Sequence, residues 1–213
     1  MKMQPAFTVI LTSALLSGIA HSQPSDPGFH AHDGFYLSLC GGFGGLTWAD
    51  DEPPVTSEMS GATGNLDFKI GGAVMRDRLI LSGDLITAHA PNPKEKGNSA
   101  PVANNASLRM GIIGMGATYY FMPVNIFLSG TFGIGRFTED FGNGQQTSDG
   151  GLGFQLKVGK EWWVSKDWGI GVSVALLHLG VPDQSNADGP GGSHLSESLG
   201  ANALGILFNS SFN

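Results

Sequence analysis

Two long segments near the C-terminal end of the chain, together spanning Gly151 to Leu177, constrain the fold more than any other feature. In the first segment, large apolar residues at every second position share one face, while Gly, Gln, Lys and Glu share the other. The turn Ser165-Lys166-Asp167 follows, and the alternation resumes at Trp168. A period of two predicts β-strands with one apolar face. The first segment has 14 residues and the second has ten, whereas a strand usually has about 5–6.

The composition of the two faces favours strands that cross a membrane. The polar face carries small residues and a few charges, which is typical of a barrel strand with lipid on one side and a narrow lumen on the other. Trp162, Trp163 and Trp168 cluster at the turn, where such a barrel has an aromatic girdle. No stretch of 18 or more apolar residues occurs beyond the N-terminal region. A membrane-embedded mature chain must therefore be a closed barrel, because open sheet edges cannot face lipid.

The chain divides into three parts on this interpretation. Residues 1–20 are expected to be a signal peptide, with Lys2 in the positive n-region, an apolar h-region and cleavage after Ala20 or Ser22. Residues 21–33 form a periplasmic lead-in, and residues 34–213 form the barrel. Charged residues make up only 14% of the chain, against about 25% in soluble proteins. The net charge of −7 argues against nucleic acid as a partner.

Two smaller features each have a plain and a functional interpretation. His30, His32 and Asp33 in the lead-in are expected to lie in a solvated polar linker. The alternative is a pair of metal ligands, which would need further ligands at fixed spacing. Cys40 is the only cysteine of the chain, so it cannot form an intramolecular disulfide. It is expected to be a small residue on a strand, with a reactive thiol as the alternative.

Alternation elsewhere predicts six further strands, which gives eight in all. The strands are expected at residues 34–47, 63–75, 78–90, 106–121, 125–138, 151–164, 168–177 and 196–213. Tight turns near residues 76, 123 and 166 alternate with longer loops at 48–62, 91–105, 139–149 and 182–195. This asymmetry is that of bacterial outer-membrane barrels, and an even strand count places both termini in the periplasm. The predicted fold is therefore all-β: an eight-stranded antiparallel up-and-down transmembrane β-barrel with four external loops.

The last strand carries the most specific resemblance to known proteins. Hydrophobic residues stand at alternate positions and an aromatic is next to last: Leu204, Ile206, Phe208 and Phe212. This resembles the C-terminal signature of outer-membrane barrels, although Ser210 and Asn213 depart from it. The run Gly159-Lys160-Glu161-Trp162-Trp163-Val164 is also similar to a segment of bacterial outer-membrane barrel proteins. The mature chain resembles the small eight-stranded OmpA/OmpX-like barrels of Gram-negative bacteria, which implies the barrel assembly machinery as a partner during biogenesis.

The lumen of the predicted barrel is its main candidate site. Eight strands enclose an interior that side chains just fill. The alternation directs three acids and three bases inward: Asp67, Lys69, Asp84, Arg109, Lys157 and Glu161. Because a buried unpaired charge is costly, we expect a paired network. Lys157 and Glu161 are about 13 Å apart along one strand at ~3.3 Å per residue, so each should pair with residues of other strands.

The function that these features favour is structural or interactive. The chain is expected to form a barrel with a narrow, charge-plugged lumen that presents its loops at the cell surface. Inward glycines leave room for water, so a gated ion path or small conductance is one alternative. A soluble ligand-binding barrel is another, but it would place its large apolar side chains inside.

An enzyme that modifies lipid A is the alternative from another class. His194-Leu195-Ser196 is similar to the His-x-Ser element of outer-membrane lipid A deacylases, in which the serine needs a histidine base within hydrogen-bond reach. The same stretch is equally typical of a flexible loop, so we expect no catalytic residue, no cofactor-binding residue, no metal site and no cofactor. The expected partners are outer-membrane lipid or lipopolysaccharide, and the chain is expected to be a monomer.

Overall fold

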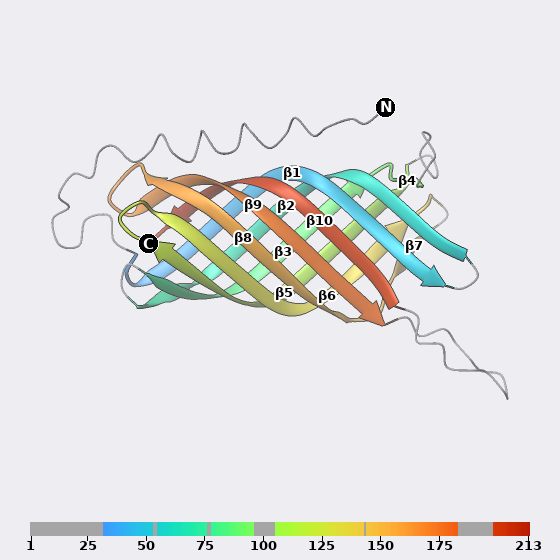
Figure 1. Cartoon of the computed structure of the whole chain (residues 1–213), viewed down its shortest axis with the longest axis horizontal. Coiled ribbons are helices and arrows are strands. Elements are labelled where there is room, and N and C mark those ends of the chain that lie inside the picture. Colours follow the sequence, from blue (N-terminus) through green and yellow to red (C-terminus); the bar gives the residue numbers. More distant parts are fainter. Residues whose placement is uncertain (1–31, 53–54, 76–77, 96–104, 143, 183–197) are drawn as a thin grey trace, which may run out of the picture.

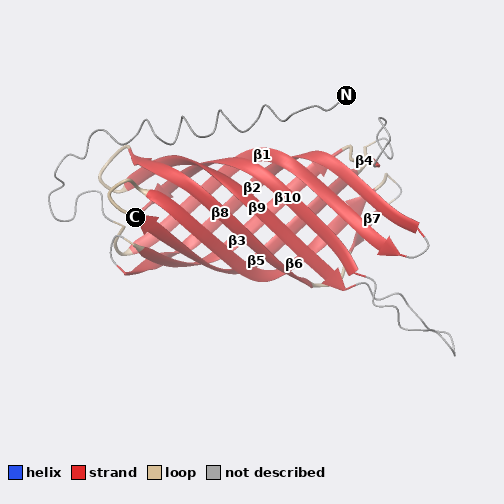
Figure 2. Cartoon of the chain, viewed as in Figure 1, coloured by secondary structure: helices blue, strands red, loops and turns tan. Residues whose placement is uncertain are grey.

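The structure is a computed structural model that describes residues 32–52, 55–75, 78–95, 105–142, 144–182 and 198–213. Every regular element in these ranges is a strand (Figure 2). The long strands are β1 (Phe35–Glu52), β2 (Val55–Met75), β3 (Leu79–Pro91), β5 (Ser107–Phe121), β6 (Ile126–Asp140), β8 (Gly151–Trp163), β9 (Trp168–Pro182) and β10 (Ser198–Phe212). Two short strands are β4 (Lys94–Glu95) and β7 (Gln145–Thr147). None of the segments in the described ranges forms a helix long and apolar enough to cross a membrane.

The eight long strands close into a barrel (Figure 1). Each pairs antiparallel with its neighbours in the chain, and β1 pairs with both β2 and β10. Leu37 is the Cα partner of Phe212 at one end of the closing ladder, and Asp50 is the partner of Leu199 at the other. The predicted eight-stranded antiparallel up-and-down barrel is confirmed.

The outer wall of the barrel is a belt of exposed apolar side chains. Along β8, Leu152, Phe154, Leu156 and Val158 point outward, and the residues between them are buried. Even large side chains are open: Phe43 is 61% exposed and Met115 is 79% exposed. A soluble protein rarely exposes so continuous an apolar surface, whereas a barrel in lipid requires one. The chain is therefore an outer-membrane β-barrel, and the soluble ligand-binding barrel is excluded.

Aromatic residues gather at the end of the barrel that carries the short turns. The indole of Trp168 lies 5.3 Å from the ring of Phe212, and Phe35 lies 6.5 Å from Phe212 on the other side. Phe35 and Trp168 are exposed and Phe212 is half-buried between them, and together these rings form the predicted girdle. Tyr36 and Tyr120, at the same end, instead point into the lumen and are almost fully buried.

The segment 48–62 is not a loop, as the sequence predicted, but the continuation of the first hairpin. β1 runs on to Glu52 and β2 begins at Val55, and the ladder includes Asp50 opposite Ser57. Most residues of this stretch are polar, so the apolar alternation that marks a strand is lost while backbone pairing continues. The loops at 91–105 and 139–149 likewise contain β4, which pairs with β2, and β7, which pairs with β6.

The facing of the first half of β5 was also predicted wrongly. Leu108, Met110 and Ile112 were expected to face lipid, but they are buried inside the barrel, and Arg109 is exposed on the outer wall. The prediction assumed that large apolar residues always face lipid. In this half of the barrel the interior is apolar as well, so hydrophobicity does not distinguish the two faces. The signal peptide with its cleavage site at Ala20 or Ser22 lies outside the described residues.

Candidate functional site

The interior of the barrel has two layers, which differ in polarity. We call the layer nearer the short turns the polar layer, with Ser38, Asp67, Lys69, Ser82, Asp84, Thr118, Ser129, Thr131, Gln155, Lys157, Glu161, Ser173, Asn209 and Ser211. The apolar layer lies nearer the long loops, with Leu46, Trp48, Met59, Ile86, Ala88, Ala90, Leu108, Met110, Ile112, Phe137, Leu177, Leu179, Val181, Ala201 and Ala203. All of these side chains are buried.

An ion pair between opposite walls crosses the polar layer. Lys157 Nζ on β8 lies 3.1 Å from Asp67 Oδ2 on β2, and these strands stand four places apart around the ring of eight. The side-chain amide of Gln155 donates to the same oxygen at 3.0 Å, and the thiol sulfur of Cys40 lies 3.3 Å from Lys157 Nζ. The expectation that Lys157 pairs with an acid of another strand is confirmed.

A second ion pair joins adjacent strands. Lys69 on β2 and Asp84 on β3 are Cα partners, and their side chains form a fully buried salt bridge. Lys69 Nζ also donates to Thr131 Oγ1 at 3.0 Å, and Ser82 Oγ donates to Asp84 Oδ1 at 2.5 Å. A buried ion pair is tolerated when further hydrogen bonds satisfy both charges, and that condition is met here.

Glu161 lies at the short-turn end of the polar layer. Its carboxylate accepts hydrogen bonds from the hydroxyl of Ser211 at 2.8 Å and from that of Tyr120 at 3.2 Å. The hydroxyls of Tyr120 and Tyr36 lie 3.3 Å apart. Glu161 is therefore held by two hydroxyl donors that come from other strands, β5 and β10.

His32 closes this end of the lumen, although the sequence indicated a solvated linker. The side chain is fully buried, and its ring is stacked on that of Tyr120 with 3.6 Å between centroids. Its two ring nitrogens each lie 2.8 Å from an amide oxygen, one of Asn125 and one of Asn213. No local pattern marks His32, because its partners are 93 and 181 residues away in the chain. Asp33 beside it is exposed.

The sequence suggested that the inward glycines leave room for water, but neighbouring side chains occupy that space. A Cβ on Gly116 would stand 2.1 Å from Asp84 Oδ2, and one on Gly153 would stand 2.3 Å from Ile112 Cδ1. Larger side chains from neighbouring strands thus fill the space above these glycines. Between the two layers there is a cavity of only about 10 Å³, which is about the minimum that holds one water molecule.

Five of the six charged residues predicted to face the lumen do so, and Arg109 does not. Lys160 is also buried. The alternation did not predict this, because its neighbour Glu161 is buried too. Its ammonium donates to the carbonyl oxygen of Val124 at 2.5 Å, in the turn between β5 and β6. His30, His194 and Ser196 lie outside the described residues. Within those residues no group of three or more His, Cys, Asp or Glu side chains is placed to hold a metal ion.

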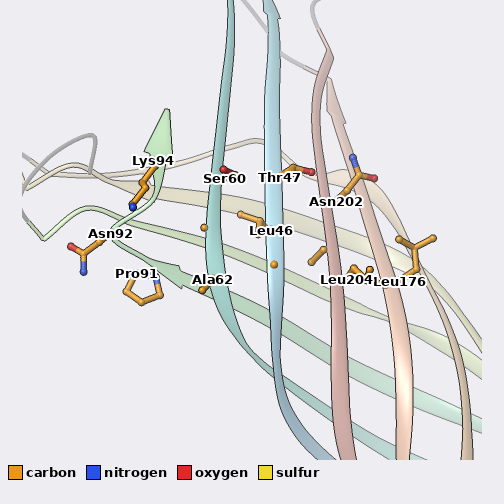
Figure 3. A pocket seen from close by; sticks show the side chains of 13 residues that line it. Leu46, Thr47, Ser60, Ala62, Pro91, Asn92, Lys94, Leu176, Asn202 and Leu204 are labelled. Carbon is orange, nitrogen blue, oxygen red and sulfur yellow. The ribbon is translucent and has the colours of Figure 1, made fainter. Parts of the chain in front are cut away.

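The outer wall also has a hollow, of about 680 Å³, near the end with the long loops. Figure 3 shows it over β1, β2 and β10, with Thr47, Ser60 and Ala62 on its floor and Lys94 at one side. Small residues, among them Gly45, Ser60, Gly61 and Ala62, line much of it.

Comparison with known proteins gives only a distant likeness in overall structure. No protein-family model matches the chain, and no curated protein matches it. Among solved structures, it is similar to Neisserial surface protein A, with 13% identity, a TM-score of 0.46, and 83% of this chain and 97% of that protein covered. It is also similar to the outer membrane protein OprG from Pseudomonas aeruginosa, with 15% identity, a TM-score of 0.46, and coverage of 88% and 100%. At such identities the likeness concerns fold alone.

Proposed function

We propose that this chain is a closed scaffold of the outer membrane, whose role lies in structure or in contacts at the cell surface rather than in solute passage. The filled interior carries this proposal. The pair of Lys157 and Asp67 bridges opposite walls, and the apolar layer lies between this pair and the long loops. The cavity between the layers is about 10 Å³. A hydrated ion would have to break the ion pairs and then cross an apolar region.

The length of the first hairpin supports the surface role. A tilted transmembrane strand needs about 9–11 residues, whereas β1 has 18 and β2 has 21. Figure 1 shows this hairpin, in blue and cyan, reaching beyond the other strands at the long-loop end. Since the short-turn end holds both the first and the last described strand termini, the hairpin lies on the external side.

Conductance across planar lipid bilayers tests the proposal. We expect the refolded wild-type protein to give no unitary current steps under conditions in which a larger porin, reconstituted in the same way, conducts. Arg109→Ala, on the outer wall, should be equally silent. Reproducible steps from the wild-type barrel would contradict the closed lumen and would favour the small-conductance alternative.

A further inference from the structure

The outer wall of the barrel carries a cluster of two arginines and one histidine on three adjacent strands, β3, β5 and β6. His89 and Arg109 are Cα partners, and Arg136 is paired with Gly111, two residues from Arg109 on the same face. Together with Thr87 and Thr138 they line a hollow of about 470 Å³. Only four arginines occur in the chain, and two of them are here.

The cluster stands at the outer border of the apolar belt. Leu85, Ile113 and Ile134, the outward residues next to it on the three strands, are all exposed and apolar. From Gly111 to Phe121, β5 has about the 9–11 residues that a tilted strand needs to cross the membrane. The outward residue beyond this span is Arg109. The cluster therefore lies at the level of the lipid headgroups of the outer leaflet.

The two arginines of the cluster are open to the outside. Arg109 and Arg136 are exposed, and neither forms an ion pair with a carboxylate of the described residues. Asp140, further along β6, accepts a hydrogen bond from the backbone N–H of Gly142. The Nδ1 atom of His89 is buried and has no hydrogen-bond partner. Two guanidinium groups are thus available to a ligand from outside, with the half-buried ring of His89 beside them.

We propose that His89, Arg109 and Arg136 bind a phosphate group of lipid A, the phosphorylated glycolipid of the outer leaflet. Guanidinium groups pair with phosphate through two parallel N–H···O bonds, which a point charge cannot match. The hydroxyls of Thr138 and Thr147, which lie 3.3 Å apart at the rim of the hollow, are placed to donate to the sugar or to a second phosphate oxygen. The acyl chains lie along the apolar belt below. This site is on the outer wall, so it is independent of the closed lumen.

Lipid binding to the detergent-solubilised, folded barrel tests this site. Native mass spectrometry would give the affinity for bis-phosphorylated lipid A and for the same lipid after enzymatic dephosphorylation. We expect the wild type to prefer the phosphorylated form by tenfold or more, and Arg109→Gln/Arg136→Gln to bind both forms equally. Arg78→Gln is the matched control, because Arg78 is exposed at the opposite end, where it contacts the hydroxyl of Tyr119. It should keep the full preference.

Several results would overturn the proposal. They are equal wild-type affinities for the two lipid forms, a preference that survives the double substitution, or loss of the preference in Arg78→Gln. Displacement of lipid A by inorganic phosphate at equal concentration would show a site for free phosphate instead. If the double variant does not fold, as judged by gel mobility with and without heating, Arg109→Lys and Arg136→Lys replace it. Each keeps the charge but not the paired donors, so each should weaken the preference, and an unchanged preference in both would refute the site.

Discussion

The ion pair of Lys157 with Asp67 is the contact on which the closed interior depends most. Lys157→Met removes the cation and leaves Asp67 buried beside Gln155, so we expect it to cost about 3–5 kcal/mol of stability. The free energy of unfolding in detergent, measured with denaturant, reports this loss. Arg109→Met is the control, because that side chain is on the outer wall and its loss should be small.

The double variant Lys157→Met/Asp67→Asn completes this test. Its loss should be smaller than the sum of the two single losses, because the two side chains meet directly. Strict additivity would mean that the ion pair does not form in the folded barrel.

Gly116 tests whether the polar layer is tightly packed. A Cβ at this position would overlap the carboxylate of Asp84, which is held by Lys69 and Ser82 and cannot retreat freely. We therefore expect Gly116→Ala to lower the free energy of unfolding by about 1–3 kcal/mol. Gly64→Ala is the control, since nothing lies within 4 Å of its added Cβ. Equal effects of the two substitutions would indicate a loosely filled lumen.

At the scale of single residues, the sequence predicted the charged interior well and its edges poorly. Five charged residues of the lumen occupy the same alternate positions as the small residues of their strands, so the sequence indicates which way they face. They are Asp67, Lys69, Asp84, Lys157 and Glu161. Arg109 alternates with Leu108 and Met110, and there the apolar layer makes the inner face look like a lipid face. His32 has no periodic signal at all, because Asn125 and Asn213 hold it from distant parts of the chain.

At the scale of single strands, the loss of stability caused by a charged residue on the outer wall depends on its depth in the membrane. Leu156 lies in the middle of β8 and faces lipid with 52% of its surface exposed. Leu156→Arg should cost about 2–4 kcal/mol of barrel stability in lipid bilayers, as at a bilayer midplane, whereas Thr47→Arg near the rim should cost about 0–1. Equal, small costs measured by denaturant unfolding would show that Leu156 does not face the membrane interior.

In the first hairpin, strand pairing continues beyond the part of the two strands that crosses the membrane. Replacing residues 50–57 with the two-residue turn Asn-Gly joins Ala49 to Glu58, which are already Cα partners. Because the removed rungs lie beyond the apolar belt, we expect a change of less than about 0.5 kcal/mol in the free energy of unfolding. A large loss would show that the extended hairpin stabilises the barrel itself and is more than a surface feature.

The sequence located the ends of most strands but not those of this hairpin, for a physical reason. Strands inside the membrane are bounded by the change from apolar to polar residues on their outer face. Residues 48–62 are mostly polar and include Pro53-Pro54, so composition indicated a loop, while the backbone ladder continues and Trp48 and Met59 lie in the apolar layer. β4 and β7 were missed for the same reason.

For the molecule as a whole, we infer a closed barrel whose lumen excludes water. Cys40 provides a direct probe of it, because it is the only cysteine of the chain and lies inside the lumen with 1% of its surface exposed. It contacts Lys157 Nζ in the polar layer. A water-soluble maleimide therefore has to pass either the apolar layer or His32 to reach its thiol.

Labelling of Cys40 by such a maleimide, followed by mass spectrometry, is the most direct measurement. We expect Cys40 in the folded barrel to stay unmodified over hours and to react within minutes once the barrel is unfolded in denaturant. In Cys40→Ser/Thr47→Cys, which places the thiol on the exposed outer wall near the rim, the folded protein should react at once. Rapid modification of Cys40 in the folded wild type would mean that water and solutes enter the lumen, and would contradict the closed barrel.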